Sequence, residues 1–152
     1  MPPMFPFDDS PRFLIADDDP ICAEVAGETL RPWGEVEIAT DGTAAVLAVE
    51  HALSAGKWFD VILMDIYMPN MDGLGAIHAL RACERRAGSQ RMRVLISSVA
   101  NPNAPMHTQL QDLVDGYFAK PLDSLALLTQ LRHWQILPPD EDAHNTTAIL
   151  RT

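Results

Sequence analysis

Apolar and polar residues alternate along the chain in blocks that predict strands and helices in turn. Short apolar runs, of which residues 61–64 are the most continuous, are typical of strands buried on both faces of a parallel sheet. Longer segments with apolar residues at helical spacing lie between these runs. Strands are expected at RFLIAD (12–17), EVEIAT (35–40), residues 60–65, MRVLISS (92–98) and GYFAK (116–120). Helices are expected at residues 19–33, 41–56 and 73–88, in a short segment starting near Met106, and at 121–135.

Capping residues and prolines indicate where the predicted helices begin and end. Asp19 followed by Pro20 is a helix start, because the carboxylate caps free amide groups and proline fits the first turn. We interpret Asp19 as this cap and not as a metal ligand. Pro32 and Gly34 are expected to stop the first helix. The alternation of strands and helices predicts an α/β fold with a doubly wound parallel sheet.

Length and composition limit this fold to one domain. A chain of 152 residues with 47% hydrophobic residues can bury a single core. We expect the domain to span residues 12–136, between a flexible N-terminus (1–11) and a disordered, proline-led tail (137–152). Cys22 and Cys83 lie in helical patterns and are expected to be buried thiols, with no disulfide between them.

Charge and hydropathy exclude several kinds of partner. A net charge of −10 argues against binding to nucleic acid, which needs a basic surface. No apolar run approaches the about 20 residues that span a bilayer, so no membrane partner is expected. The first twelve residues lack the basic flank and apolar segment of a secretory signal, which predicts a cytoplasmic protein.

Polar residues follow the predicted strands at the points where the strands end. Open α/β sheets hold their ligands at the carboxyl ends of the strands, so these side chains are expected to share one rim. They are Asp17, Asp18, Asp65, Ser98 and Lys120. Three carboxylates at one rim repel one another and are tolerated chiefly around a cation. Oxygen ligands without histidine or cysteine favour Mg²⁺, for which Mn²⁺ or Ca²⁺ is expected to substitute.

The same residues suit the transfer of a phosphoryl group. A carboxylate can attack phosphorus while a metal ion and Lys120 neutralise the charge that develops on the phosphoryl oxygens. Ser98 offers a hydroxyl to a further oxygen. The rim therefore predicts a phosphoryl-transfer site.

Residues 12–136 resemble the receiver domain of two-component response regulators, in particular the single-domain regulators of chemotaxis. The resemblance rests on LIADDDP, ILMDIYMPNMDG, VLISS and YFAKP, which occur in the family's order at the ends of the predicted strands. It implies a flavodoxin-like sheet with strand order 2-1-3-4-5 and five helices in three αβα layers.

The resemblance also assigns a role to each residue of the rim. Asp65 is implied to be the phosphoacceptor and, with Asp18, a direct Mg²⁺ ligand, while Asp17 binds the ion through water. The backbone carbonyl of Tyr67 completes the protein's ligands. Ser98 is implied to be the switch hydroxyl and Tyr117 the switch aromatic residue. Lys120 is implied to be the ion-pair partner of Asp65, with a cis peptide bond between Lys120 and Pro121.

The sequence departs from the family pattern at two positions beside the site. Val99 follows Ser98 where the family usually has alanine or glycine, and it is expected to slow phosphorylation by small phosphodonors. Tyr67 lies two residues after Asp65 and is expected to exclude water and prolong the life of an acyl phosphate.

The resemblance implies a stand-alone receiver, which is a signalling domain and not an enzyme. It would take a phosphoryl group from a sensor histidine kinase or a histidine phosphotransfer protein and then change its binding to a downstream protein target. A receiver-like module that is never phosphorylated is one alternative. A Mg²⁺-dependent phosphohydrolase is a second, but such enzymes need an acid two residues after the nucleophile, where this chain has Tyr67.

Overall fold

The computed structural model describes residues 10–68, 72–99 and 110–139. Within these residues five strands form one parallel sheet in the order β2-β1-β3-β4-β5, which confirms the predicted topology. The strands are β1 (Arg12–Ala16), β2 (Glu35–Ala39), β3 (Val61–Asp65), β4 (Arg93–Ser98) and β5 (Gly116–Ala119). Each strand occupies a segment where an apolar run predicts one.

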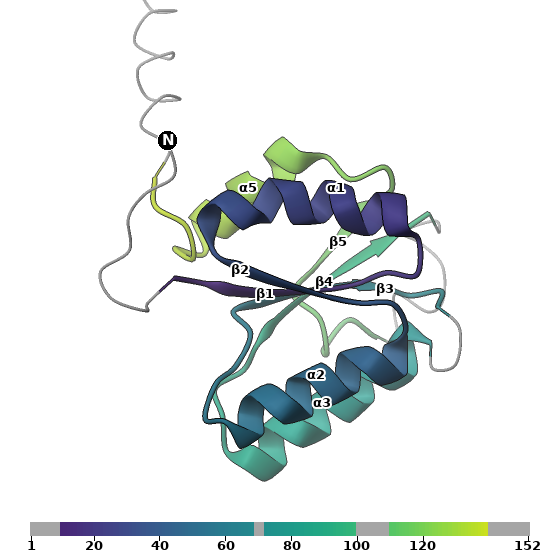
Figure 1. Ribbon diagram of the computed structural model, residues 1–152, viewed down its shortest axis with the longest axis vertical. Helices are drawn as coiled ribbons and strands as arrows, with labels where there is room; N and C mark the ends of the chain where they lie inside the picture. The colour runs from purple at the N-terminus through teal and green to yellow at the C-terminus, as the bar shows by residue number, and fades with distance from the viewer. Residues whose placement is uncertain (1–9, 69–71, 100–109, 140–152) are drawn as a thin grey trace, which may run out of the picture.

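Helices connect the strands and cover both faces of the sheet. Figure 1 shows α1 and α5 on one face and α2 and α3 on the other. The helices are α1 (Pro20–Leu30), the 3-10 helix η1 (Arg31–Trp33), α2 (Gly42–Ser54), α3 (Gly73–Ala87) and α5 (Ser124–His133). The short helix expected near Met106 falls in a segment that lies outside the described residues, which resume at Leu110. None of the described helices combines the length and apolar character that crossing a bilayer requires.

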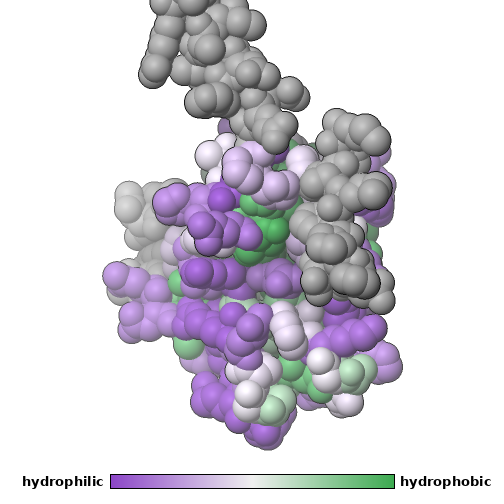
Figure 2. Space-filling view, turned by 90° about the vertical axis from the view of Figure 1, so that its left-hand side faces the viewer, coloured by the Kyte–Doolittle hydropathy of each residue, from purple (hydrophilic) through white to green (hydrophobic). Residues whose placement is uncertain are grey.

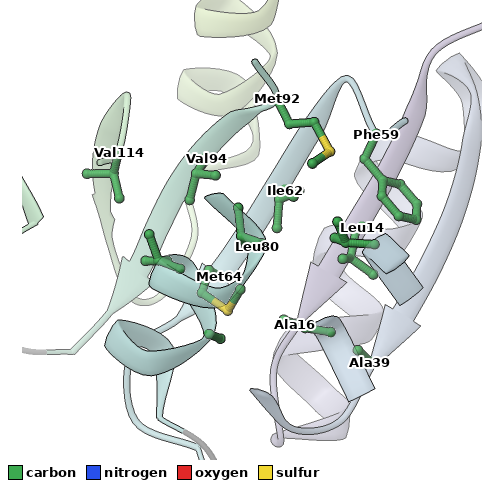
Figure 3. Packing of buried hydrophobic residues seen from close by; sticks show 14 of the residues in the cluster. Leu14, Ala16, Ala39, Phe59, Ile62, Met64, Leu80, Met92, Val94 and Val114 are labelled. Carbon is green, nitrogen blue, oxygen red and sulfur yellow. The ribbon is translucent and has the colours of Figure 1, made fainter. Parts of the chain in front are cut away.

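Two apolar clusters hold the three layers together, one on each face of the sheet. Side chains on opposite faces alternate along a strand, so neighbouring residues join different clusters. Leu14 and Ile62 pack with α2 and α3, whereas Ile15 and Leu63 pack with α1 and α5. Figure 3 shows the first cluster, in which Leu80 of α3 lies against the strands. The three inner strands, β1, β3 and β4, are therefore buried on both faces, as their apolar runs predict, whereas the edge strands β2 and β5 are partly exposed.

Aspartates cap the helices at the ends that face the rim. The side chain of Asp19 accepts a hydrogen bond from the amide of Ile21, which confirms its predicted capping role. The caps of α2, α3 and α5 are Asp41, Asp72 and Asp123. Each carboxylate satisfies an amide that has no partner within its helix, and it lies at the favourable end of the helix dipole.

The structure corrects two details of the prediction, the end of the first helix and the burial of Cys22. The α-helix α1 ends at Leu30 and not at Trp33, because Pro32 lacks an amide hydrogen and the chain continues as a 3-10 turn. Cys22 is only half-buried, although Cys83 is buried as expected. Leu137 is 2% exposed and packs in the cluster under α1 and α5.

A buried ion pair joins α3 to the strands beside it. Arg81 and Glu84 are one turn apart on α3, and both face inwards, with 5% and 6% of their surface exposed. The Arg81 guanidinium donates to a Glu84 carboxylate oxygen at 2.8 Å and to the backbone oxygens of Met92 and Leu113, both at 2.8 Å. Arg81 thereby ties α3 to the segments that lead into β4 and β5.

The sheet has two functionally different ends. Figure 2 views the molecule from the end where the strands begin, and the described surface there is mostly hydrophilic. The strands run away from this surface, so their carboxyl ends meet at the opposite end of the molecule. The polar residues that were predicted to share one rim lie at these carboxyl ends.

Candidate functional site

Asp65 is the last residue of β3, the central strand of the sheet, and is held rigidly in place. Its register partner in β4 is Ser97, and only 6% of its surface is exposed. One carboxylate oxygen, Oδ1, accepts a hydrogen bond of 3.1 Å from the amide of Tyr67. The second oxygen accepts a bond from Lys120. The strand thus ends on a carboxylate that the sheet and the following turn fix in orientation.

Asp17 and Asp18 follow β1, the neighbouring strand, and differ in exposure. Asp17 is 6% exposed, its Oδ1 accepts a 2.9 Å hydrogen bond from the amide of Asp19, and its own amide binds the carbonyl of Ala39. Asp18 is exposed. The predicted pair is therefore one buried, oriented carboxylate and one carboxylate open to solvent.

Lys120 extends over the two buried carboxylates from the end of β5. Its Nζ lies 2.9 Å from Asp17 Oδ2 and 3.1 Å from Asp65 Oδ2. Its backbone amide donates to the carbonyl of Ser98, and the bond between Lys120 and Pro121 is cis, as the resemblance implied. Burial alone would lower the pKa of Lys120, but its hydrogen bonds to Asp17 and Asp65 outweigh this effect and raise it. The lysine is therefore held as a cation.

The three carboxylates form a candidate cation site. Asp17, Asp18 and Asp65 each offer an oxygen atom, and these atoms lie within 4.8 Å of one another. Hard oxygen donors with one open side suit Mg²⁺, which keeps several waters when it binds. One ammonium group near three carboxylates leaves a net negative charge, so the donor set fits a divalent cation.

The other predicted residues lie around this cluster at different depths. Ser98 is 3% exposed at the end of β4, and Tyr117 is 37% exposed on β5, the edge strand. Tyr67 is 51% exposed and Val99 is 78% exposed. The expected effects of Tyr67 on hydrolysis and of Val99 on phosphorylation stay predictions.

Sequence reasoning missed Ser97, which neighbours Ser98 but points to the other face of the sheet. Leu95 of β4 packs with α1 and α5, whereas Val94 and Ile96 pack with α2 and α3. The alternation along the strand places Ser97 with Leu95. Ser97 accordingly lines a cavity beside Asp65 and Lys120. This strand alternation was the signal in the sequence that could have found it.

Asp65→Asn should raise the melting temperature of the Mg²⁺-free protein at neutral pH. Burial raises the pKa of Asp65, and the Tyr67 amide and Lys120 only partly offset this effect. A carboxyl whose pKa is higher in the folded chain costs stability once it ionises, so the penalty is present at pH 7 and disappears below the unfolded pKa of about 4. The difference in melting temperature from wild type should therefore shrink in acid.

Thermal unfolding followed by circular dichroism from pH 7 to pH 4 measures this difference. Asp112→Asn is the matched control, since Asp112 is exposed and its replacement removes the same formal charge. A melting temperature for Asp65→Asn at or below that of wild type at pH 7 would contradict the prediction.

Gly73→Ala should disturb the turn that follows Asp65. A Cβ atom on Gly73 would lie 2.6 Å from both the carbonyl oxygen of Asp65 and the Cα of Ile66, which are backbone atoms. We expect the free energy of unfolding to fall by about 1–3 kcal/mol, as for other overpacked sites. Urea unfolding measures this loss.

Gly27→Ala is the control for this substitution. Its Cβ would meet only the flexible Arg31 guanidinium, at 3.0 Å, and alanine is the better helix former. That variant should be neutral or more stable. Equal stability of Gly73→Ala and wild type would show that the close approach imposes no constraint.

The fold and this rim together define a class of protein. A parallel sheet of this order, with an acidic cluster and a lysine at the carboxyl ends of its strands, is the arrangement of domains that accept phosphoryl groups. The family model of the response regulator receiver domain matches residues 13–132. The chain belongs to this family.

Curated relatives are two-component signalling proteins. The chain is 30% identical over 126 residues to the sensor protein GacS of Pseudomonas syringae, covering 82% of this chain and 13% of GacS. It is 30% identical over 149 residues to the transcription factor SKN7 of Candida albicans, covering 93% of this chain and 24% of SKN7. The chain thus spans less than a quarter of the length of these relatives.

Solved structures of receiver domains share the fold. The receiver domain of the histidine kinase CKI1 from Arabidopsis thaliana, complexed with Mg²⁺ and BeF₃⁻, is 29% identical with a TM-score of 0.69, covering 81% of this chain and 92% of that one. The receiver domain of the sensor histidine kinase PA1611 from Pseudomonas aeruginosa, with Mg²⁺ in its active-site cleft, is 28% identical with a TM-score of 0.69. That match covers 82% of this chain and 97% of the PA1611 domain.

Proposed function

We propose that the chain accepts a phosphoryl group on Asp65 from a phosphohistidine and then changes its affinity for a downstream protein. The donor would be a histidine kinase or a histidine phosphotransfer protein. The observation that carries this proposal is the pairing of a buried, oriented Asp65 carboxylate with Lys120 Nζ at 3.1 Å, beside two further carboxylates.

The chemical step is a displacement at phosphorus. A carboxylate oxygen of Asp65 forms the new P–O bond, and the P–N bond to the donor histidine breaks, returning the electron pair to the imidazole ring. Lys120 is within reach of the oxygens that gain negative charge in this step. The hydrogen bond from the Tyr67 amide to Oδ1 holds the carboxylate so that Oδ2 faces the lysine.

Asp17, Asp18 and Asp65 would hold Mg²⁺, with the Tyr67 carbonyl as a further ligand. When bound, the ion supplies positive charge that reduces repulsion between the carboxylates and the incoming phosphoryl group. Magnesium in the receiver domains of CKI1 and PA1611 supports the assignment of the ion. The acidic cluster of this chain supports the assignment of the ligands.

An apolar surface beside the rim fits a protein donor better than a small one. Ile21 and Val25 of α1 are 74% and 42% exposed, and both line the cavity that Asp17, Asp65 and Lys120 also border. Large exposed apolar side chains gathered near a site are typical of docking surfaces.

Phosphorylation would act by shifting a population between two conformations. In this mechanism the phosphoryl group draws the Ser98 hydroxyl toward Asp65, and Tyr117 on β5 responds by changing its exposure. The lysine would leave its ion pair with Asp17 to contact the phosphoryl oxygens. A partner that binds the shifted form more tightly would read the signal.

Intact-mass spectrometry after incubation with Mg²⁺ and acetyl phosphate tests the proposal. We expect one phosphoryl addition on the wild type and on Asp112→Asn, and none on Asp65→Asn. If small donors fail, the test is repeated with a purified histidine phosphotransfer protein, because Val99 is expected to slow the small donors. Absence of the addition with both kinds of donor would favour a receiver-like module that is never phosphorylated.

A further inference from the structure

A cavity of about 160 Å³ lies between α1 and the sheet, directly beneath Lys120. Its mouth is bordered by exposed or half-buried side chains of α1 and of the segment between β5 and α5. Its inner wall is made of buried apolar side chains. The lining residues include Ala26, Leu63, Ser97, Lys120 and Leu122.

Ser97 is the uncharged hydroxyl residue in the lining of this cavity, which also includes the charged groups of Asp17, Asp65 and Lys120. It is 5% exposed, and its oxygen is not among the fully buried side-chain atoms of the described residues that lack a partner, so the hydroxyl is open to the cavity. A hydroxyl that faces a cavity can form a hydrogen bond with a molecule bound there.

The size and the walls of the cavity define what that occupant is. An engineered apolar cavity of about 150 Å³ in another protein binds benzene. Here the walls are mostly apolar, from Ile15, Val25, Ala26 and Leu63, with Ser97 on one side. A ligand needs an apolar body of about the size of a benzene ring and one group that bonds the serine hydroxyl.

The charges around the cavity exclude ionic ligands. Asp17 and Asp65 border it and would repel an anion, and Lys120 is already engaged by both carboxylates. A cation would lose its hydration against apolar walls, where only the rim carries compensating charge. A neutral molecule meets neither penalty.

We infer that this cavity binds a small neutral molecule with an aromatic or branched aliphatic body and a single hydroxyl, held by a hydrogen bond to Ser97. Such a ligand would lie against the side of Asp65 and Lys120 that faces α1. The inference does not depend on phosphorylation of Asp65. It assigns to the domain a second, chemical input next to the carboxylate cluster.

Phenol and toluene are the probes that test this assignment. They have the same number of non-hydrogen atoms and differ only in a hydroxyl or a methyl group. Titration of ¹⁵N-labelled protein without Mg²⁺, followed by chemical shifts, gives both affinities and the residues that respond. We expect saturable shifts at the residues that line the cavity.

Two variants separate the cavity from other sites. Ser97→Ala should lower the ratio of phenol to toluene affinity by about two- to tenfold, which is the worth of one hydrogen bond. Ala26→Leu should fill the cavity and weaken both probes at least about tenfold. The dispersion of the amide spectrum shows whether Ala26→Leu is folded. If Ala26→Leu is unfolded, Ser97→Ala, which removes a single oxygen, provides the test.

Three outcomes would overturn the inference. They are an absence of saturable shifts with either probe at millimolar concentration, shifts confined to residues away from the cavity, and an affinity ratio that is unchanged in Ser97→Ala. The tests of phosphorylation are separate, so a failure here leaves the proposed function untouched.

Discussion

Replacing Lys120 by methionine is expected to tighten Mg²⁺ binding by about tenfold or more. The lysine ammonium occupies oxygens of Asp17 and Asp65 at 2.9 and 3.1 Å, and it would repel an ion held by the same groups. A divalent ion about 5 Å from a single charge is repelled by about 1.7 kcal/mol even at the permittivity of water, and each 1.4 kcal/mol corresponds to about a tenfold change. Methionine keeps the apolar stem and removes the charge.

The same variant should accept phosphoryl groups more slowly, because Lys120 no longer neutralises the oxygens that gain charge. Isothermal titration calorimetry measures the affinity for Mg²⁺, and intact mass after acetyl phosphate measures the acceptance. A misfolded variant would lose both Mg²⁺ binding and phosphoryl acceptance, so tighter Mg²⁺ binding together with slower acceptance would rule out misfolding as the cause. Lys57→Met, at an exposed lysine, is the matched control. Weaker Mg²⁺ binding by Lys120→Met would contradict the electrostatic argument.

Arg81→Met is expected to lower the free energy of unfolding by about 3–5 kcal/mol. Removing one partner of a buried ion pair leaves the other charged and without compensation, and losses of this size are typical. The variant would leave the Glu84 carboxylate with the Met92 amide but without a cation, and it would remove the guanidinium from the carbonyl oxygens of Met92 and Leu113. Urea unfolding gives the loss from the shift of the transition midpoint.

Arg31→Met supplies the comparison for this variant. Arg31 pairs with Glu24 at 2.7 Å, but both side chains are about half exposed, so its loss should cost much less than the loss of Arg81. The double variant Arg81→Met with Glu84→Leu should recover part of the stability, because no charge is left unpaired. Equal losses for Arg81→Met and Arg31→Met would show that burial adds nothing to the pair.

The fold and the rim could be predicted because both follow from local patterns. Residues 61–64 show a strand buried on both faces, and parallel strands bring their carboxyl ends together. Asp65 and Lys120, 55 positions apart, could thus be placed at one rim before their 3.1 Å contact was known. Asp19 could be assigned as a cap because its partner, the Ile21 amide, is local.

What could not be predicted depends on contacts between distant segments. Arg81 and Glu84 look like members of an ordinary solvated face of a helix, and only the approach of the chain before β4 and β5 buries them. The continued packing of Leu137 depends likewise on the cluster beneath α1 and α5. The pocket beside Ser97 exists because α1 and the segment after Lys120 leave space between them, which no pattern along the chain records.

The packing of Leu137 also determines how the domain can be connected to other proteins. Strand β1 begins and the chain after α5 packs near the end of the molecule that lies opposite Asp65. Polypeptide added before Arg12 or after Leu137 would start from that end and leave the carboxylate rim uncovered. A fluorescent protein or a surface tether could therefore be joined before Arg12 or after Leu137 and would lie at the end of the molecule opposite the carboxylate rim.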